Sequence, residues 1–170
     1  PEEFRFLSGL LLYQQGDKCA AAVGLFHRLS KLPAWQSEAD FYLAMCSRKL
    51  GLETDFLERA RRVIDAQDVH YSVKLMKEIG YEVPYEFTET FGAALAKAIN
   101  NPKFREAVDD EMRANIAYVR TEYGTATDKY KLAQTWAPHV PETHPKYLQA
   151  RFLNALAEYQ VGSKSKALQM

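Results

Sequence analysis

The same short amphipathic segment occurs near both ends of the chain. Residues 5–16 read RFLSGLLLYQQG, and residues 151–162 read RFLNALAEYQVG. At one constant offset the two copies share an arginine, a phenylalanine, two leucines, a tyrosine, a glutamine and the closing glycine. Ala21 and Ala167 follow the two glycines at the same distance. A helix-length segment that recurs in this way is typical of an all-α chain in which similar helical units stack on their neighbours.

Glycine, asparagine and proline divide the rest of the chain into helices. Glycines at 16, 51, 80, 124 and 162 are predicted to end helices, and the spacing of the first two suits a helix-pair repeat of about 34 residues. We expect helices over residues 2–15, 17–31, 38–50, 54–66, 69–79, 87–99, 103–123, 128–136 and 146–162, with another beginning in 163–170. The long helix over 103–123 is expected to break near Asp109. The apolar residues at 56, 57, 60, 63 and 64 form one buried face, and the proline-rich residues 138–145 are expected to be a rigid connector.

The repeated unit resembles the tetratricopeptide repeat, a pair of antiparallel helices. The residues that carry the resemblance are Gly9, Tyr13, Gly16, Asp17, Ala21 and Pro33, then Leu43, Ala44 and Gly51, and finally Ala155, Tyr159, Gly162 and Ala167. The resemblance implies a right-handed α-solenoid of about four to five such units in one domain over residues 1–170, with a divergent unit in the middle. Ser8, Asn154 and Phe56 depart from the family pattern, which leaves the register of the units open.

Proteins similar to this family act as scaffolds or adaptors that hold a partner peptide or helix in a concave groove, within larger assemblies. Carried over by position, the groove would be lined by Phe6, Leu10, Tyr13, Gln14, Phe41, Met45, Arg48, Lys49, Tyr118, Glu122, Phe152, Leu156, Tyr159 and Gln160. Independently of the family, Phe6, Leu10 and Tyr13 share one helical stripe, as do the equivalent residues of the second copy. Such a stripe can equally be core, and the two basic residues can either clamp a carboxylate or complement a helix terminus.

Two other functions were considered. An RNA-binding helical repeat needs a basic groove, but the chain has 22 Lys and Arg against 22 Asp and Glu, so we expect no nucleic-acid partner. The chain could instead be a docking or regulatory segment of a larger enzyme. It begins at Pro1 and stops at Met170 within a predicted helix, and we therefore expect a fragment of a longer or processed protein.

No residue pattern points to catalysis, a metal or a cofactor. Two cysteines are too few for a disulfide framework and are expected to be buried thiols, and His139 and His144 are expected to be exposed loop residues. Acidic clusters at 65–68 and 109–111 are expected to cap helices. No phosphate-binding glycine loop or nucleophile motif occurs. We therefore predict that the protein is not an enzyme and needs no cofactor.

The apolar runs are shorter than a membrane-spanning helix requires, so we expect a soluble protein whose partner is another protein. The two thiols are compatible with a reducing compartment, and we expect the cytoplasm rather than the periplasm or secretion. Self-association is left open.

Overall fold

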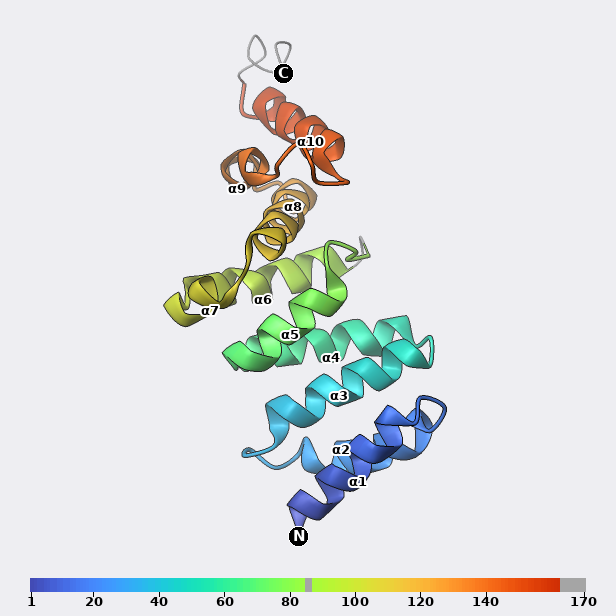
Figure 1. The fold of residues 1–170 in the computed structure, drawn as a ribbon. Helices are drawn as coiled ribbons and strands as arrows, with labels where there is room; N and C mark the ends of the chain where they lie inside the picture. Colours follow the sequence, from blue (N-terminus) through green and yellow to red (C-terminus); the bar gives the residue numbers. More distant parts are fainter. Residues whose placement is uncertain (85–86, 163–170) are drawn as a thin grey trace. The chain divides into compact units, whose positions relative to one another are not determined.

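The computed structural model describes residues 1–84 and 87–162, and all regular secondary structure in these residues is helical (Figure 1). This confirms the all-α class. The chain divides into two compact units, Pro1–Leu75 and Met76–Met170. The helix expected in residues 163–170 lies outside the described residues. None of the described helices combines the length and the apolarity that crossing a bilayer requires.

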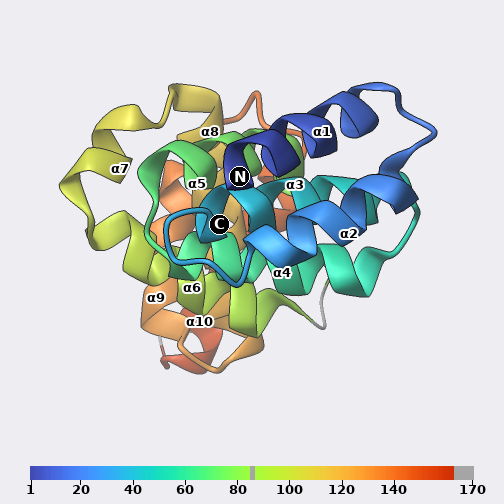
Figure 2. The same cartoon turned by 90° about the horizontal axis from the view of Figure 1, so that it is seen from below.

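Four helices and the start of a fifth form the first unit. They are α1 (Glu2–Gln14), α2 (Cys19–Leu29), α3 (Gln36–Lys49), α4 (Glu53–Asp65) and α5 (Val69–Ile79), whose last residues belong to the second unit. α1 packs against α2, α2 against α3 and α3 against α4, and Figures 1 and 2 show α1, α2 and α3 side by side. The predicted face of α4 is buried at all five positions. Gly16 and Gly51 follow α1 and α3 with φ of 70° and 71°, a left-handed conformation that glycine adopts without strain.

The second unit is organised around one long helix. Its elements are α6 (Thr88–Asn100), α7 (Pro102–Ala107), α8 (Asp110–Ala126), α9 (Tyr130–Trp136), the short 3₁₀ helix η2 (Ala137–His139) and α10 (Tyr147–Gln160). α8 packs against α6, α9, η2 and α10, and most of its residues are buried. The predicted break near Asp109 is confirmed, because the Asp109 carboxylate caps α8 by accepting a hydrogen bond from the Met112 N–H at 2.9 Å.

The predicted helix end at Gly124 is wrong. Gly124 lies inside α8, which continues to Ala126. A Cβ on Gly124 would lie 2.6 Å from the backbone nitrogen of Ala133 in α9. This glycine therefore allows two helices to approach closely, a role that a sequence pattern does not distinguish from a helix terminus.

Candidate interaction surface

The two copies of the repeated segment form α1 and α10. Both helices are followed by a glycine with positive φ, 70° at Gly16 and 95° at Gly162. Their apolar residues fall on two sides of the helix. The tyrosine face is defined by Phe6, Leu10 and Tyr13 in α1 and by Phe152, Leu156 and Tyr159 in α10. The leucine face is defined by Phe4, Leu7 and Leu11 in α1 and by Ala150, Leu153 and Ala157 in α10.

In α1 the tyrosine face is packed against α2 and α3. Phe6 is 8% exposed, and its ring centroid lies 6.1 Å from that of Phe26 and 5.8 Å from that of Tyr42. Tyr13 also packs on Tyr42, with centroids 5.3 Å apart, and Lys49 Nζ lies 3.7 Å from the Tyr13 centroid. Leu10 is partly buried against the same core. The tyrosine face of α1 is therefore a helix-packing face.

In α10 the two aromatic side chains of the equivalent face are exposed to solvent. Phe152 is 66% exposed and Tyr159 is 53% exposed. Leu148, one turn before Phe152, is 79% exposed and extends the same stripe. Leu156 is half-buried. Large apolar side chains that gather on one exposed helix face mark an interaction surface more often than scattered ones do.

The exposure of the leucine face is the reverse: it is exposed in α1 and mostly buried in α10. In α1, Phe4, Leu7 and Leu11 are 70%, 57% and 61% exposed. In α10, Ala150 and Ala157 are fully buried in the second unit, where α10 packs against α8 and α9. The same helical sequence thus packs through one face at the start of the chain and through another face near its end.

The exposed leucine face of α1 and the exposed Leu148 were not predicted from the sequence. The signal was present, because residues 4, 7 and 11 have helical spacing, as do 148 and 152. A helix with two apolar stripes gives no local sign of which stripe is covered, since the covering helix is distant in sequence.

Three of the other predicted groove residues are buried within their own units. Phe41, Met45 and Tyr118 are buried at 7%, 5% and 2% exposure, which leaves a partner almost nothing to contact. Arg48 and Lys49 occupy the last turn of α3, and the Arg48 guanidinium lies 5.4 Å from the centroid of the Phe56 ring.

Glu122 is also engaged internally, because it accepts a hydrogen bond of 2.6 Å from the Tyr118 hydroxyl. Burial raises the pKa of Tyr118, and this hydrogen bond to Glu122 raises it further. Gln14 and Gln160 are exposed. Of the predicted residues, only Phe152 and Tyr159 in α10 combine a large, mainly apolar side chain with high exposure.

The connector histidines differ from each other. His139 is exposed as expected, but the prediction of an exposed His144 is wrong: it is 8% exposed, and its Nε2 lies 3.0 Å from Asn115 Oδ1. The Lys146 backbone N–H donates to His144 Nδ1 at 3.1 Å, so Nδ1 carries no proton and Nε2 is the donor to Asn115. Burial and then the charge of Lys146 lower the pKa of His144. The neutral imidazole of His144 thus connects residues 138–145 to α8 through its hydrogen bond with Asn115.

The acidic clusters serve as caps and ion pairs rather than as ligand sets. Asp68 accepts a hydrogen bond from the Tyr71 N–H at 3.3 Å, which confirms the capping interpretation. Within the described ranges, no group of three or more potential ligand side chains is placed to hold a metal ion.

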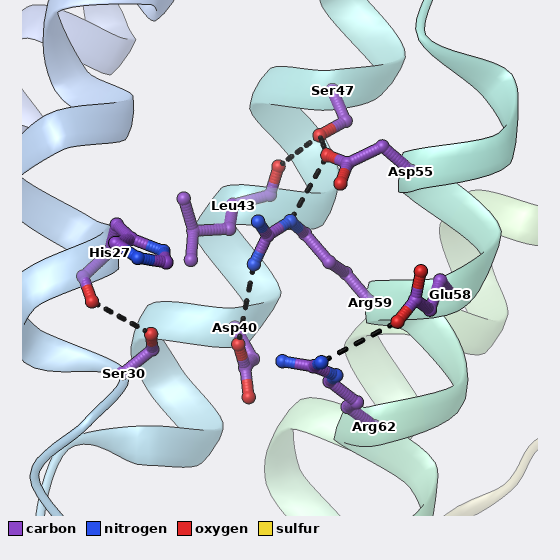
Figure 3. A network of polar contacts seen from close by, with 9 residues as sticks. All are labelled: His27, Ser30, Asp40, Leu43, Ser47, Asp55, Glu58, Arg59 and Arg62. Carbon is purple, nitrogen blue, oxygen red and sulfur yellow. Dashed lines mark hydrogen bonds and ion pairs between the residues drawn. The ribbon is translucent and has the colours of Figure 1, made fainter.

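A polar network in the first unit joins α3 to α4, as Figure 3 shows. Asp40 is 3% exposed, and its Oδ1 lies 3.8 Å from Arg59 Nη1, an ion-pair distance too long for a hydrogen bond. Arg59 Nε donates to Asp55 Oδ2 at 3.0 Å, and Asp55 also accepts a hydrogen bond from Ser47. Burial raises the pKa of Asp40, and the charges of Arg62 and Arg59 oppose this rise. The network links α3 to α4 through one buried and two partly exposed charged side chains.

No protein-family model matches the chain, and no significant match was found among curated proteins or solved structures.

Proposed function

We propose that the chain is a protein-interaction scaffold of stacked helix pairs, similar to tetratricopeptide repeats, and that the tyrosine face of α10 binds a helix of a partner protein. One observation carries this proposal. The side chains that α2 and α3 cover in α1 recur at the same positions in α10, where Phe152 is 66% exposed. A face that packs against helices in one copy is suited to pack against a helix in the other.

The first unit supplies a template for the partner. Ala22 and Phe26 of α2 and Tyr42 of α3 cover the tyrosine face of α1. A partner helix that combines a small residue with aromatic side chains at helical spacing would fit α10 in the same way.

Ala155 takes the place of Gly9 in the second copy, which changes the fit. In α1 a Cβ at Gly9 would lie only 2.8 Å from Phe26 Cε1. The partner of α10 is therefore expected to sit slightly further out than α2 does on α1, or to present a smaller side chain than phenylalanine opposite Ala155.

The aromatic residues of the face are the expected energetic centre. Fully burying a phenylalanine contributes about 1.5–3 kcal/mol, and aromatic side chains are enriched among residues that dominate interfaces. Removing the ring of Phe152 should therefore weaken capture of the partner by about 10- to 100-fold.

A photo-crosslinking amino acid at position 152 tests this function in the full chain. We expect it to form adducts with a partner protein, and the adducts should disappear in the presence of excess unlabelled wild-type chain but not of excess Phe152→Ser chain. Phe4→Ser is the matched control, because Phe4 is an equally exposed phenylalanine (70%) on the leucine face of α1. Both variants should retain the helical circular dichroism of the wild type.

Two results would contradict the proposal. One is competition by Phe152→Ser that equals competition by Phe4→Ser. The other is a crosslink from position 152 that is confined to residues 163–170 of the same chain, because the face would then be covered from within.

A further inference from the structure

A pocket of about 510 Å³ lies within the second unit, away from the tyrosine face of α10. It is open to solvent on one side and is lined by the end of α6, by α7, by the start of α8 and by the segment from α9 through η2. Its size is within the range of pockets that hold small molecules, about 300–1,000 Å³. Neither the repeat nor the proposed scaffold function accounts for it.

The floor of the pocket is apolar. It is formed by Ile99, Phe104, Val108, Ile116 and Trp136. Phe104, Val108 and Ile116 are 2%, 7% and 3% exposed, so the core holds them in place and each presents only a small area to the pocket. Ile99 and Trp136 are half-buried and present more of their surface. A ligand would have to bring an apolar body to displace water from this floor.

The rim is polar and carries an excess of positive charge. Arg113 Nη1 and Asp110 Oδ1 are 2.8 Å apart, so their charges compensate each other. Arg105 also lines the pocket, and it has no hydrogen-bond or ion-pair partner in the part of the chain that the structure describes. His139 lines the same rim, beside Trp136 at a ring-centroid distance of 6.1 Å. An uncompensated guanidinium above an apolar floor is complementary to one carboxylate on an apolar body.

We propose that this pocket binds a small amphipathic monocarboxylate, with the apolar body on the floor and the carboxylate on Arg105. The planar guanidinium can donate two parallel hydrogen bonds to one carboxylate, which an alcohol cannot accept in the same geometry. The site does not depend on the scaffold function, since it shares no residue with the tyrosine face.

The pocket contains its own spectroscopic reporter. The chain has two tryptophans, Trp35 in the first unit and Trp136 in the pocket. In a Trp35→Phe variant of the full chain, all tryptophan emission therefore comes from the pocket. Titration with decanoate below its micelle concentration should give a saturable change in this emission. An aromatic monocarboxylate of similar size, titrated in parallel, tells whether the floor prefers a chain or a ring.

Decanol and the Arg105→Gln variant together measure how much the interaction between the carboxylate and the guanidinium contributes to affinity. Decanol should bind about tenfold more weakly than decanoate, the factor that corresponds to about 1.4 kcal/mol from a charge-assisted hydrogen bond. Arg105→Gln should weaken decanoate by about the same factor and leave decanol unchanged. Arg5→Gln, in the first unit, should change neither affinity.

Three outcomes would overturn the proposal. They are the absence of a saturable change with either carboxylate, decanol binding as tight as decanoate, and an Arg105→Gln variant that weakens decanol as much as decanoate. The last outcome would show that Arg105 maintains the shape of the pocket rather than binding a carboxylate.

Discussion

Replacing Gly9 by alanine tests whether the tyrosine face of α1 is closed by α2. The new Cβ would lie 2.8 Å from Phe26 Cε1 and 2.9 Å from Phe26 Cζ. Phe26 cannot move aside cheaply, because it is fully buried and stacks on Tyr42 with an interplanar angle of 16°. Overpacking of this kind costs about 1–3 kcal/mol, whereas alanine is favoured over glycine in a helix by about 0.8–1.0 kcal/mol. We expect a net loss of about 0–2 kcal/mol in the free energy of unfolding.

Gly24→Ala is the matched control, since it is also a glycine within a helix of the first unit but has nothing within 4 Å of an added Cβ. It should stabilise the unit by about 0.5–1 kcal/mol. Urea unfolding can be followed by the fluorescence of Trp35, whose ring lies 5.2 Å from Phe6, in a Trp136→Phe background. In a Phe26→Leu background the two alanine variants should converge. Equal stabilisation by Gly9→Ala and Gly24→Ala in the wild-type background would refute the packing described for α1.

Three further predictions concern stability and reactivity. Burial and a hydrogen bond with Cys19 raise the pKa of Cys46 to about 12. At pH 8, iodoacetamide should therefore modify Cys46 about a thousandfold more slowly in the folded chain than in urea. Similar rates of modification would contradict the burial of Cys46. The pKa of His144 is lower in the folded chain than in the unfolded chain. The neutral side chain therefore contributes to stability above about pH 6.5. This contribution is lost as the pH falls below that value, because the unfolded chain then binds a proton that the folded chain does not. A His144→Gln variant should lose less stability than the wild type between pH 7 and 5 in urea titrations, and identical pH profiles would count against this assignment. Arg59→Met removes the ion pair of the buried Asp40, although the charge of Arg62 remains, and should cost about 1–3 kcal/mol. Arg5→Met breaks an exposed pair and should cost less than about 1 kcal/mol. Equal costs in thermal unfolding would rule out the buried pair.

Local patterns predicted the helices well. The helix over residues 69–79 has the predicted bounds, and every residue of the predicted stripe in α4 is buried. Apolar periodicity and the glycine that ends a helix are local properties, and they depend little on the rest of the chain.

Contacts between distant segments account for what the sequence did not predict. Gly124 reads as a helix end, but it lies where α8 and α9 cross. The sequence predicts that His144 is an exposed loop residue, but it lies in the core of the second unit, where it forms a hydrogen bond with Asn115 of α8. Asp40 gives no local sign of burial, because the arginine that compensates it comes from the next helix.

Only part of the candidate surface could be predicted from the sequence. The sequence identified the two copies of the repeated helix and the stripe that holds Phe152 and Tyr159. It could not show that this stripe is closed in α1 and open in α10, because the difference lies in the neighbouring helices.

Hydroxyl-radical footprinting of the wild-type chain, read by mass spectrometry at single residues, tests that difference most directly. Phe6 and Phe152 have the same place in the repeated segment, but they are 8% and 66% exposed. The structure predicts that Phe152 is oxidised several-fold faster than Phe6 in the isolated chain, and that bound partner protects Phe152 while leaving Phe6 unchanged. Equal protection of the two phenylalanines in the isolated chain would contradict an open face on α10.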